Sequence, residues 1–118
     1  MLGAATLMTL TTFVHLLAGG PEVRQVVAAS DLDPVVRSVS NVVWHGVSIV
    51  LALMALAMFW LTRHENRALA VMIGTIQLGF AVLFLGFGQF DLGSIFIMPQ
   101  WTVFLICPML MWFGRAHD

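Results

Sequence analysis

Residues 42–61 read VVWHGVSIVLALMALAMFWL, a run of twenty positions without a charged side chain. An α-helix needs about 20 apolar residues to cross a hydrocarbon layer about 30 Å thick. Just before this run, Asp33 and Pro34 form a typical helix start, with the aspartate as N-cap and the proline at the first helical position. The pattern therefore predicts a helix from Pro34 whose transmembrane part covers about residues 38–62.

Three further apolar runs extend outward from this one, over about residues 2–18, 68–88 and 96–114. Only 9% of the 118 residues are charged and 60% are apolar, whereas soluble domains have about 25% charged residues. We therefore expect an all-α integral membrane protein that is a single domain over residues 1–118. The short polar turn near residue 65 makes an antiparallel, up-down four-helix bundle the expected arrangement.

Residues 21–29, between the first two predicted spans, have the features of a short surface helix. Pro21 occupies a suitable first position after Gly19-Gly20, and Val23, Val26 and Val27 recur on one helical face. The sequence predicts that this segment lies in the membrane interface between transmembrane helices one and two.

The composition also excludes several classes of function. The net charge is −1 and there is no basic stripe, so a nucleic-acid partner is not expected. All five basic residues are arginines, and without lysine no retinal Schiff base can form. No nucleophile elbow, phosphate-binding loop or zinc-protease motif is present, so the sequence does not favour an enzyme.

The arginine distribution predicts the orientation. In an up-down bundle, the side that holds both termini and the turn near residue 65 has Arg63, Arg67 and Arg115, while the opposite side has Arg24 and Arg37. Because cytoplasmic loops carry the excess of Lys and Arg, we expect both termini in the cytoplasm, with the chain in a bacterial inner membrane.

Two histidines, His15 and His45, lie inside predicted spans, at similar distances from the acidic side of the bundle. An ionisable residue at such a position is a functional hypothesis by default, because burying it without a partner is costly. Polar residues share a helical face with each histidine and would supply secondary contacts. These residues are Thr11, Thr12, Asn41 and Ser48.

The histidine pair has three interpretations that the sequence leaves open. It could ligate a haem, a chlorin or copper, with Met98 as an additional soft ligand to copper. It could instead join helices by hydrogen bonds, as polar residues often do in membranes. A third interpretation is proton handling or quinol binding together with Asp91.

The remaining polar groups and the glycines of residues 68–88 indicate packing. We expect Gln77 to bond a neighbouring helix and Cys107 to be a buried, unreactive thiol. Gly74, Gly79 and Gly86 predict close helix contacts that make this helix central, or that allow self-association or binding of other membrane proteins. The favoured function is a small accessory or structural subunit of a larger membrane assembly, respiratory or photosynthetic. The alternative is a cofactor-binding or quinol-linked redox protein.

Overall fold

The computed structural model describes residues 1–114, and the secondary structure in this range is entirely helical. The elements are α1 (Leu2–Val14), the π-helical segment η1 (His15–Arg24), α2 (Gln25–Ala28), α3 (Pro34–Leu61), α4 (Arg67–Leu92) and α5 (Trp101–Phe113). The first three elements form one uninterrupted helix, Leu2–Ala28. This helix, α3 and α4 are each long and apolar enough to cross a membrane, and α5 is a shorter apolar helix.

Local signals set the ends of the helices. The Asp33 carboxylate accepts a hydrogen bond of 2.8 Å from the backbone N–H of Val35, which confirms the predicted N-cap of α3. The Asn66 side chain caps α4 in the same way, accepting from the N–H of Leu69 at 2.9 Å. Gly93 adopts φ 74° and ends α4, because a left-handed conformation is least costly for glycine.

The sequence predicts that the first helix ends at Gly19-Gly20-Pro21, but the helix continues past this point. Residues 21–29 are not a separate helix: up to Ala28 they continue the first one. In an α-helix, Pro21 would lack a donor and crowd the carbonyl group four residues earlier. The chain instead widens into η1, whose hydrogen bonds connect residues five apart, and so carries the proline within a continuous helix.

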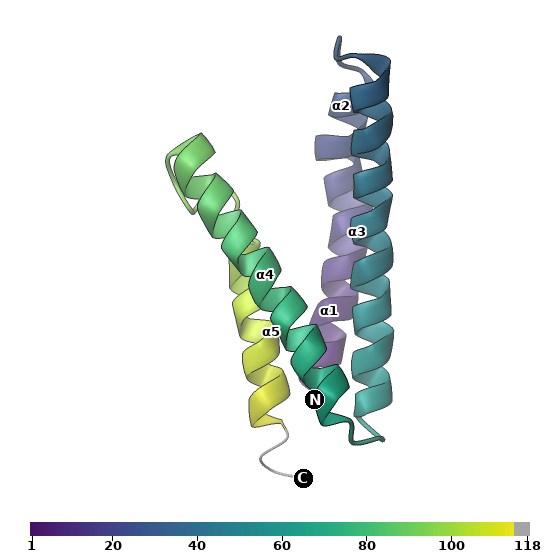
Figure 1. Ribbon diagram of the computed structural model, residues 1–118, viewed down its shortest axis with the longest axis vertical. Helices are drawn as coiled ribbons and strands as arrows, with labels where there is room; N and C mark the ends of the chain where they lie inside the picture. Colours follow the sequence, from purple (N-terminus) through teal and green to yellow (C-terminus); the bar gives the residue numbers. More distant parts are fainter. Residues whose placement is uncertain (115–118) are drawn as a thin grey trace.

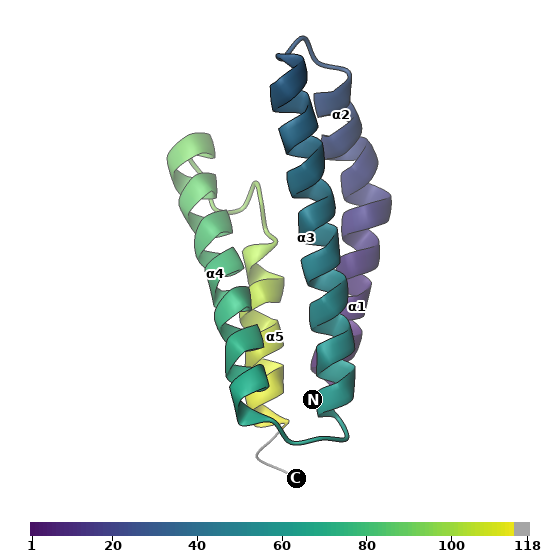
Figure 2. The same ribbon diagram turned by 45° about the vertical axis from the view of Figure 1, so that its right-hand side comes forward.

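Two helical hairpins make up the molecule (Figures 1 and 2). The first hairpin comprises residues 2–61 and pairs Leu2–Ala28 with α3; the second comprises residues 67–113 and pairs α4 with α5. Both hairpins meet at the end of the molecule that holds Met1, the turn after Leu61 and Gly114, called the terminal end below. In Figure 1 the hairpins diverge away from it, towards the distal end.

The core lies where the hairpins meet. Ala4, Ala5 and Met8 of α1 are fully buried, because α1 packs against both α3 and α5. The expectation that residues 68–88 form the central helix is therefore wrong, since α4 packs chiefly on α5 and touches α3 only weakly. Small side chains at Ala4 and Ala5 allow α1 to approach its neighbours closely.

Candidate functional site

His15 is the first residue of η1, at the point where the helix changes from α to π geometry. Its Nε2 atom lies 2.9 Å from the hydroxyl oxygen of Ser48 on α3. The imidazole ring also stacks on the indole ring of Trp44, with centroids 4.0 Å apart and planes inclined by 16°. We call His15, Trp44 and Ser48 the His15 cluster.

Ser48 lies within hydrogen-bond distance of both His15 and its own helix backbone. The Ser48 hydroxyl donates its single proton to the backbone carbonyl of Trp44, at 3.0 Å. With the hydroxyl proton placed there, the same oxygen accepts from His15 in the tautomer that carries its proton on Nε2. In this tautomer the lone pair on Nδ1 is left as the acceptor or ligand of the ring.

Gly19 leaves space for the indole ring of Trp44 because it has no side chain. A Cβ atom at Gly19 would lie 2.6 Å from Cη2 of Trp44, closer than two carbon atoms can approach without displacement. One turn after His15, the missing side chain of Gly19 thus leaves the space that the indole occupies beside η1. Neighbouring Gly20 is different, because a Cβ atom there would meet nothing within 4 Å.

His45 is not part of this cluster. Its side chain is exposed, whereas Trp44 and Ser48, four residues apart on one face of α3, point to His15. From the sequence we expect His45, rather than Trp44, to share a helical face with Ser48. Neighbouring residues of an α-helix point about 100° apart, so Trp44 and His45 cannot both face His15. Residues four apart share a face, so the spacing of Trp44 and Ser48 indicates the face that meets His15.

Of the other predicted site residues, none forms a side-chain hydrogen bond with the ring of His15 within residues 1–114. The hydroxyl groups of Thr11 and Thr12 donate to carbonyl groups of their own helix, at 2.8 and 2.9 Å. Asn41 is exposed. Met98 belongs to the second hairpin, where its methyl group lies against Gly88. Within residues 1–114, no three His, Cys, Asp or Glu side chains gather in a way that could hold a metal ion.

Gln77 on α4 is fully buried, unlike the partly buried residues of the His15 cluster. The Gln77 amide nitrogen donates to the sulfur atoms of Met58 on α3, at 3.7 Å, and of Cys107 on α5, at 3.5 Å. Gln77 thus bonds neighbouring helices, as the sequence indicated. Cys107 is buried, and its thiol donates to the carbonyl group of Ala4 on α1, at 3.4 Å. This one network connects all the long helices of the described chain.

Comparison with known proteins adds no relative: no family model, curated protein or solved structure matches this chain.

We predict that Gly19→Ala destabilises the protein by about 1–3 kcal/mol, the usual cost of overpacking, because the new methyl group displaces Trp44 from His15. Unfolding in detergent, followed by circular dichroism, measures the stability, and tryptophan fluorescence reports the stacking. Gly20→Ala is the matched control, because its methyl group enters open space. Equal stability of the two variants would show that Trp44 does not depend on Gly19.

Proposed function

We propose that this chain is a small integral membrane subunit that functions by packing against a larger membrane assembly, respiratory or photosynthetic. One observation carries the proposal: the chain between α4 and α5, residues 93–100, is not helical. It follows α4, whose 26 residues rise about 39 Å, and leads into α5, whose 13 residues rise only about 20 Å. The two helices are thus very unequal partners in one hairpin.

The unequal lengths matter in a bilayer. Both helices begin or end at the terminal end, so α5 stops about 10 Å short of crossing a hydrocarbon layer of about 30 Å. Part of the non-helical segment would then stand at hydrocarbon depth, where irregular backbone is stable only if protein covers it. Within this chain Phe96 is 74% exposed and Ile97 is 59% exposed. A partner subunit that covers this segment would resolve the conflict.

The glycines of α4 support the same proposal. An added Cβ atom at Gly74, Gly79 or Gly86 would meet nothing within 4 Å, so the small residues do not serve packing inside the chain. They leave α4 open to close approach by a helix of another membrane protein, or by a second copy of this chain. In the assembled protein the four helices would complete an up-down bundle, with the partner supporting the diverging hairpins.

The length of the helix Leu2–Ala28 indicates where the distal end of the first hairpin would lie relative to the bilayer. The helix Leu2–Ala28 rises about 40 Å, which exceeds the hydrocarbon thickness by roughly 10 Å. We therefore propose that residues 21–29, which include the last turns of this helix, lie in the headgroup region, where the exposed side chains of Val23 and Val26 would touch lipid.

A second candidate function rests on the His15 cluster. In the tautomer with its proton on Nε2, His15 would offer Nδ1 as a ligand to a haem, a chlorin magnesium or copper, and Ser48 would orient the ring from its other nitrogen. Binding of a quinol at the same histidine is the corresponding proton-linked alternative. His45, whose side chain is exposed, would take part through a ligand or a partner that contacts it as well as His15.

Photo-crosslinking in native membranes tests the subunit proposal. A photoreactive amino acid in place of Phe96 is expected to give one discrete protein adduct, because a partner covers this segment. The same probe in place of Val42, which is 71% exposed on α3, is the control and should react mainly with lipid.

Substitutions sharpen this test. Gly79→Leu should abolish the Phe96 adduct, because a large side chain keeps the partner helix away, while leaving the fold intact. Gly46→Leu is the matched control, since a Cβ atom there also meets nothing within 4 Å. Lipid adducts alone at position 96 would contradict the proposal.

The cofactor alternative predicts a coloured or metal-containing protein. Material solubilised in mild detergent should show a Soret or chlorin band, or one equivalent of copper, and His15→Ala should abolish it because the ligating nitrogen is lost. Ser48→Ala should weaken binding about 10–100-fold through the loss of ring orientation. A colourless, metal-free protein that takes up none of these cofactors would leave the His15 cluster a helix-joining contact.

We also propose that both termini lie in the cytoplasm of a bacterial cell. Arg63 and Arg67 lie at the terminal end, whereas the Arg37 guanidinium donates to carbonyl groups near the distal end, at 3.3 and 3.4 Å. The third arginine of the cytoplasmic count, Arg115, lies outside the described residues.

Labelling of single cysteines tests the orientation. In a Cys107→Ala background, Asp31→Cys should react with an impermeant maleimide on intact cells and Glu65→Cys should react only after lysis. The reverse pattern would place the termini outside.

A further inference from the structure

A groove runs between α4 and α5 near the terminal end of the molecule. Its volume is about 240 Å³, and side chains of both helices line it. Gly74 keeps the groove open, because it has no side chain and a Cβ atom there would meet nothing within 4 Å. The lining residues include Ala70, Gly74, Leu78, Pro108, Met111 and Trp112.

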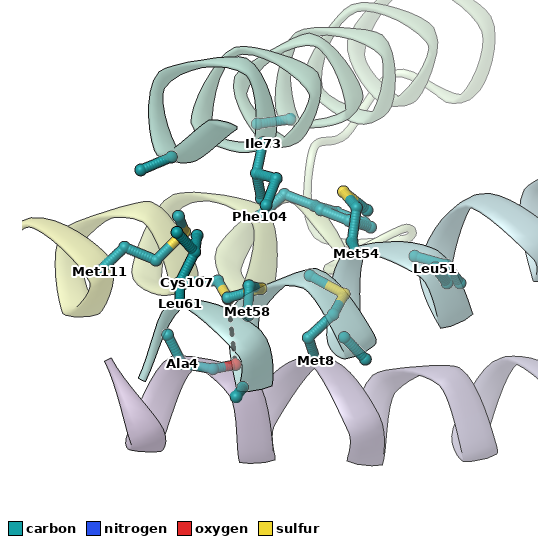
Figure 3. Packing of buried hydrophobic residues seen from close by; sticks show 14 residues of the cluster. Ala4, Met8, Leu51, Met54, Met58, Leu61, Ile73, Phe104, Cys107 and Met111 are labelled. Atoms are coloured by element: carbon teal, nitrogen blue, oxygen red, sulfur yellow. Dashed lines mark hydrogen bonds between the residues drawn. The ribbon is translucent and has the colours of Figure 1, made fainter. Parts of the chain in front are cut away.

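The groove faces the surroundings of the protein rather than its core. Ile73 of α4 and Phe104 of α5 belong to the buried cluster drawn in Figure 3. In contrast, Val71 and Leu78 in the groove wall are 52% and 48% exposed. The Thr75 hydroxyl, which also lines the groove, donates its proton to the backbone carbonyl of Val71 at 2.9 Å. The wall therefore offers no free hydroxyl proton and suits hydrocarbon.

A positive charge stands at the mouth of the groove. Arg67 is the first residue of α4, and its side chain is exposed. Val71, Gly74 and Leu78 follow Arg67 by four, seven and eleven residues, a spacing that places them on the same helical face as the arginine. Because side chains of a helix lean towards its N-terminus, the guanidinium extends from the groove to the level of the lipid headgroups.

We propose that this groove binds one acyl chain of an anionic phospholipid, whose phosphate pairs with Arg67. Charge complementarity favours this occupant, because a single phospholipid joins an apolar chain to a negative headgroup, and basic residues beside crevices between transmembrane helices bind such headgroups. The depth also fits: residues 70–78 rise about 12 Å, within the roughly 15 Å of one hydrocarbon leaflet. Trp112, in the last turn of α5, lines the groove at the interface, where tryptophan is common.

The groove and the face proposed to meet a partner subunit are different sides of α4. Gly79 and Gly86 follow Gly74 by five and twelve residues, so they are turned from it by about 120–140° around the helix axis. A lipid in the groove leaves these two glycines open to a partner helix. The lipid proposal therefore does not depend on the proposed subunit function.

Native mass spectrometry of the purified full-length protein tests the proposal. The protein is released in mild detergent from vesicles that contain equal amounts of phosphatidylglycerol and phosphatidylcholine with identical acyl chains. Each chain should retain one phosphatidylglycerol in preference to phosphatidylcholine. Arg67→Gln should lower this preference about 5-fold, the usual electrostatic contribution of one arginine near anionic lipid.

Gly74→Leu should abolish the retention of either lipid, because the leucine side chain fills the groove. Gly79→Leu is the matched control, since a Cβ atom there also meets nothing within 4 Å but points to a different side of α4. Arg24→Gln removes the same charge near the distal end and should leave the lipid preference unchanged.

The proposal is overturned if the protein retains no lipid, if Gly74→Leu retains as much lipid as Gly79→Leu, or if Arg67→Gln keeps the wild-type preference. Displacement of the lipid by glycerol phosphate, which has the charge without the chain, would also overturn it and leave only an anion site at Arg67. A lipid-free dimer that Gly74→Leu dissociates would instead assign the groove to a second copy of this chain. If Gly74→Leu fails to fold, comparison of Arg67→Gln with Arg24→Gln still decides, because both change side chains outside the core.

Discussion

The packing of the first turns of α1 between α3 and α5 holds the two hairpins together. Ala4 and Ala5 are fully buried there, and the carbonyl group of Ala4 accepts from the thiol of Cys107. In lipid, apolar side chains gain little free energy by moving from lipid into a protein core. Close contact between small residues therefore supplies much of the helix-packing energy. The core, the Gln77 network and the approach of Met1 to Gly114 all depend on this contact.

The sequence predicted the helices well where local chemistry alone determines them. The charge-free run of residues 42–61, the Asp33 cap and the polar turn near residue 65 require only short-range rules, and all are found. It failed at Pro21, because a proline after two glycines usually ends a helix. A π-helical segment that carries the proline depends on packing of η1 against α3, which no local rule contains.

In the candidate site, too, the contacts that depend on tertiary packing could not be predicted from the sequence. That His15 meets α3 through Ser48 could be predicted from polar residues on facing helices. Its stacking on Trp44 could not, because the rotation of α3 decides whether Trp44 or His45 faces inward, and tertiary packing sets that rotation. The sulfur contacts of Gln77 were equally hidden, since they join residues 19 and 30 positions apart on three different helices.

The one-sided placement of the core has a consequence for local opening. Buried side chains concentrate at the terminal end, whereas η1 has only Gly20 buried and α2 has none. Free energies of local opening follow the density of buried contacts, so they should fall steadily from the terminal end to the distal end. Amide protons of α1 would exchange only through global unfolding, whereas those of α2 would exchange by fraying. Local stability is thus high at the terminal end and low at the distal end, and the His15 cluster lies on the boundary between the two.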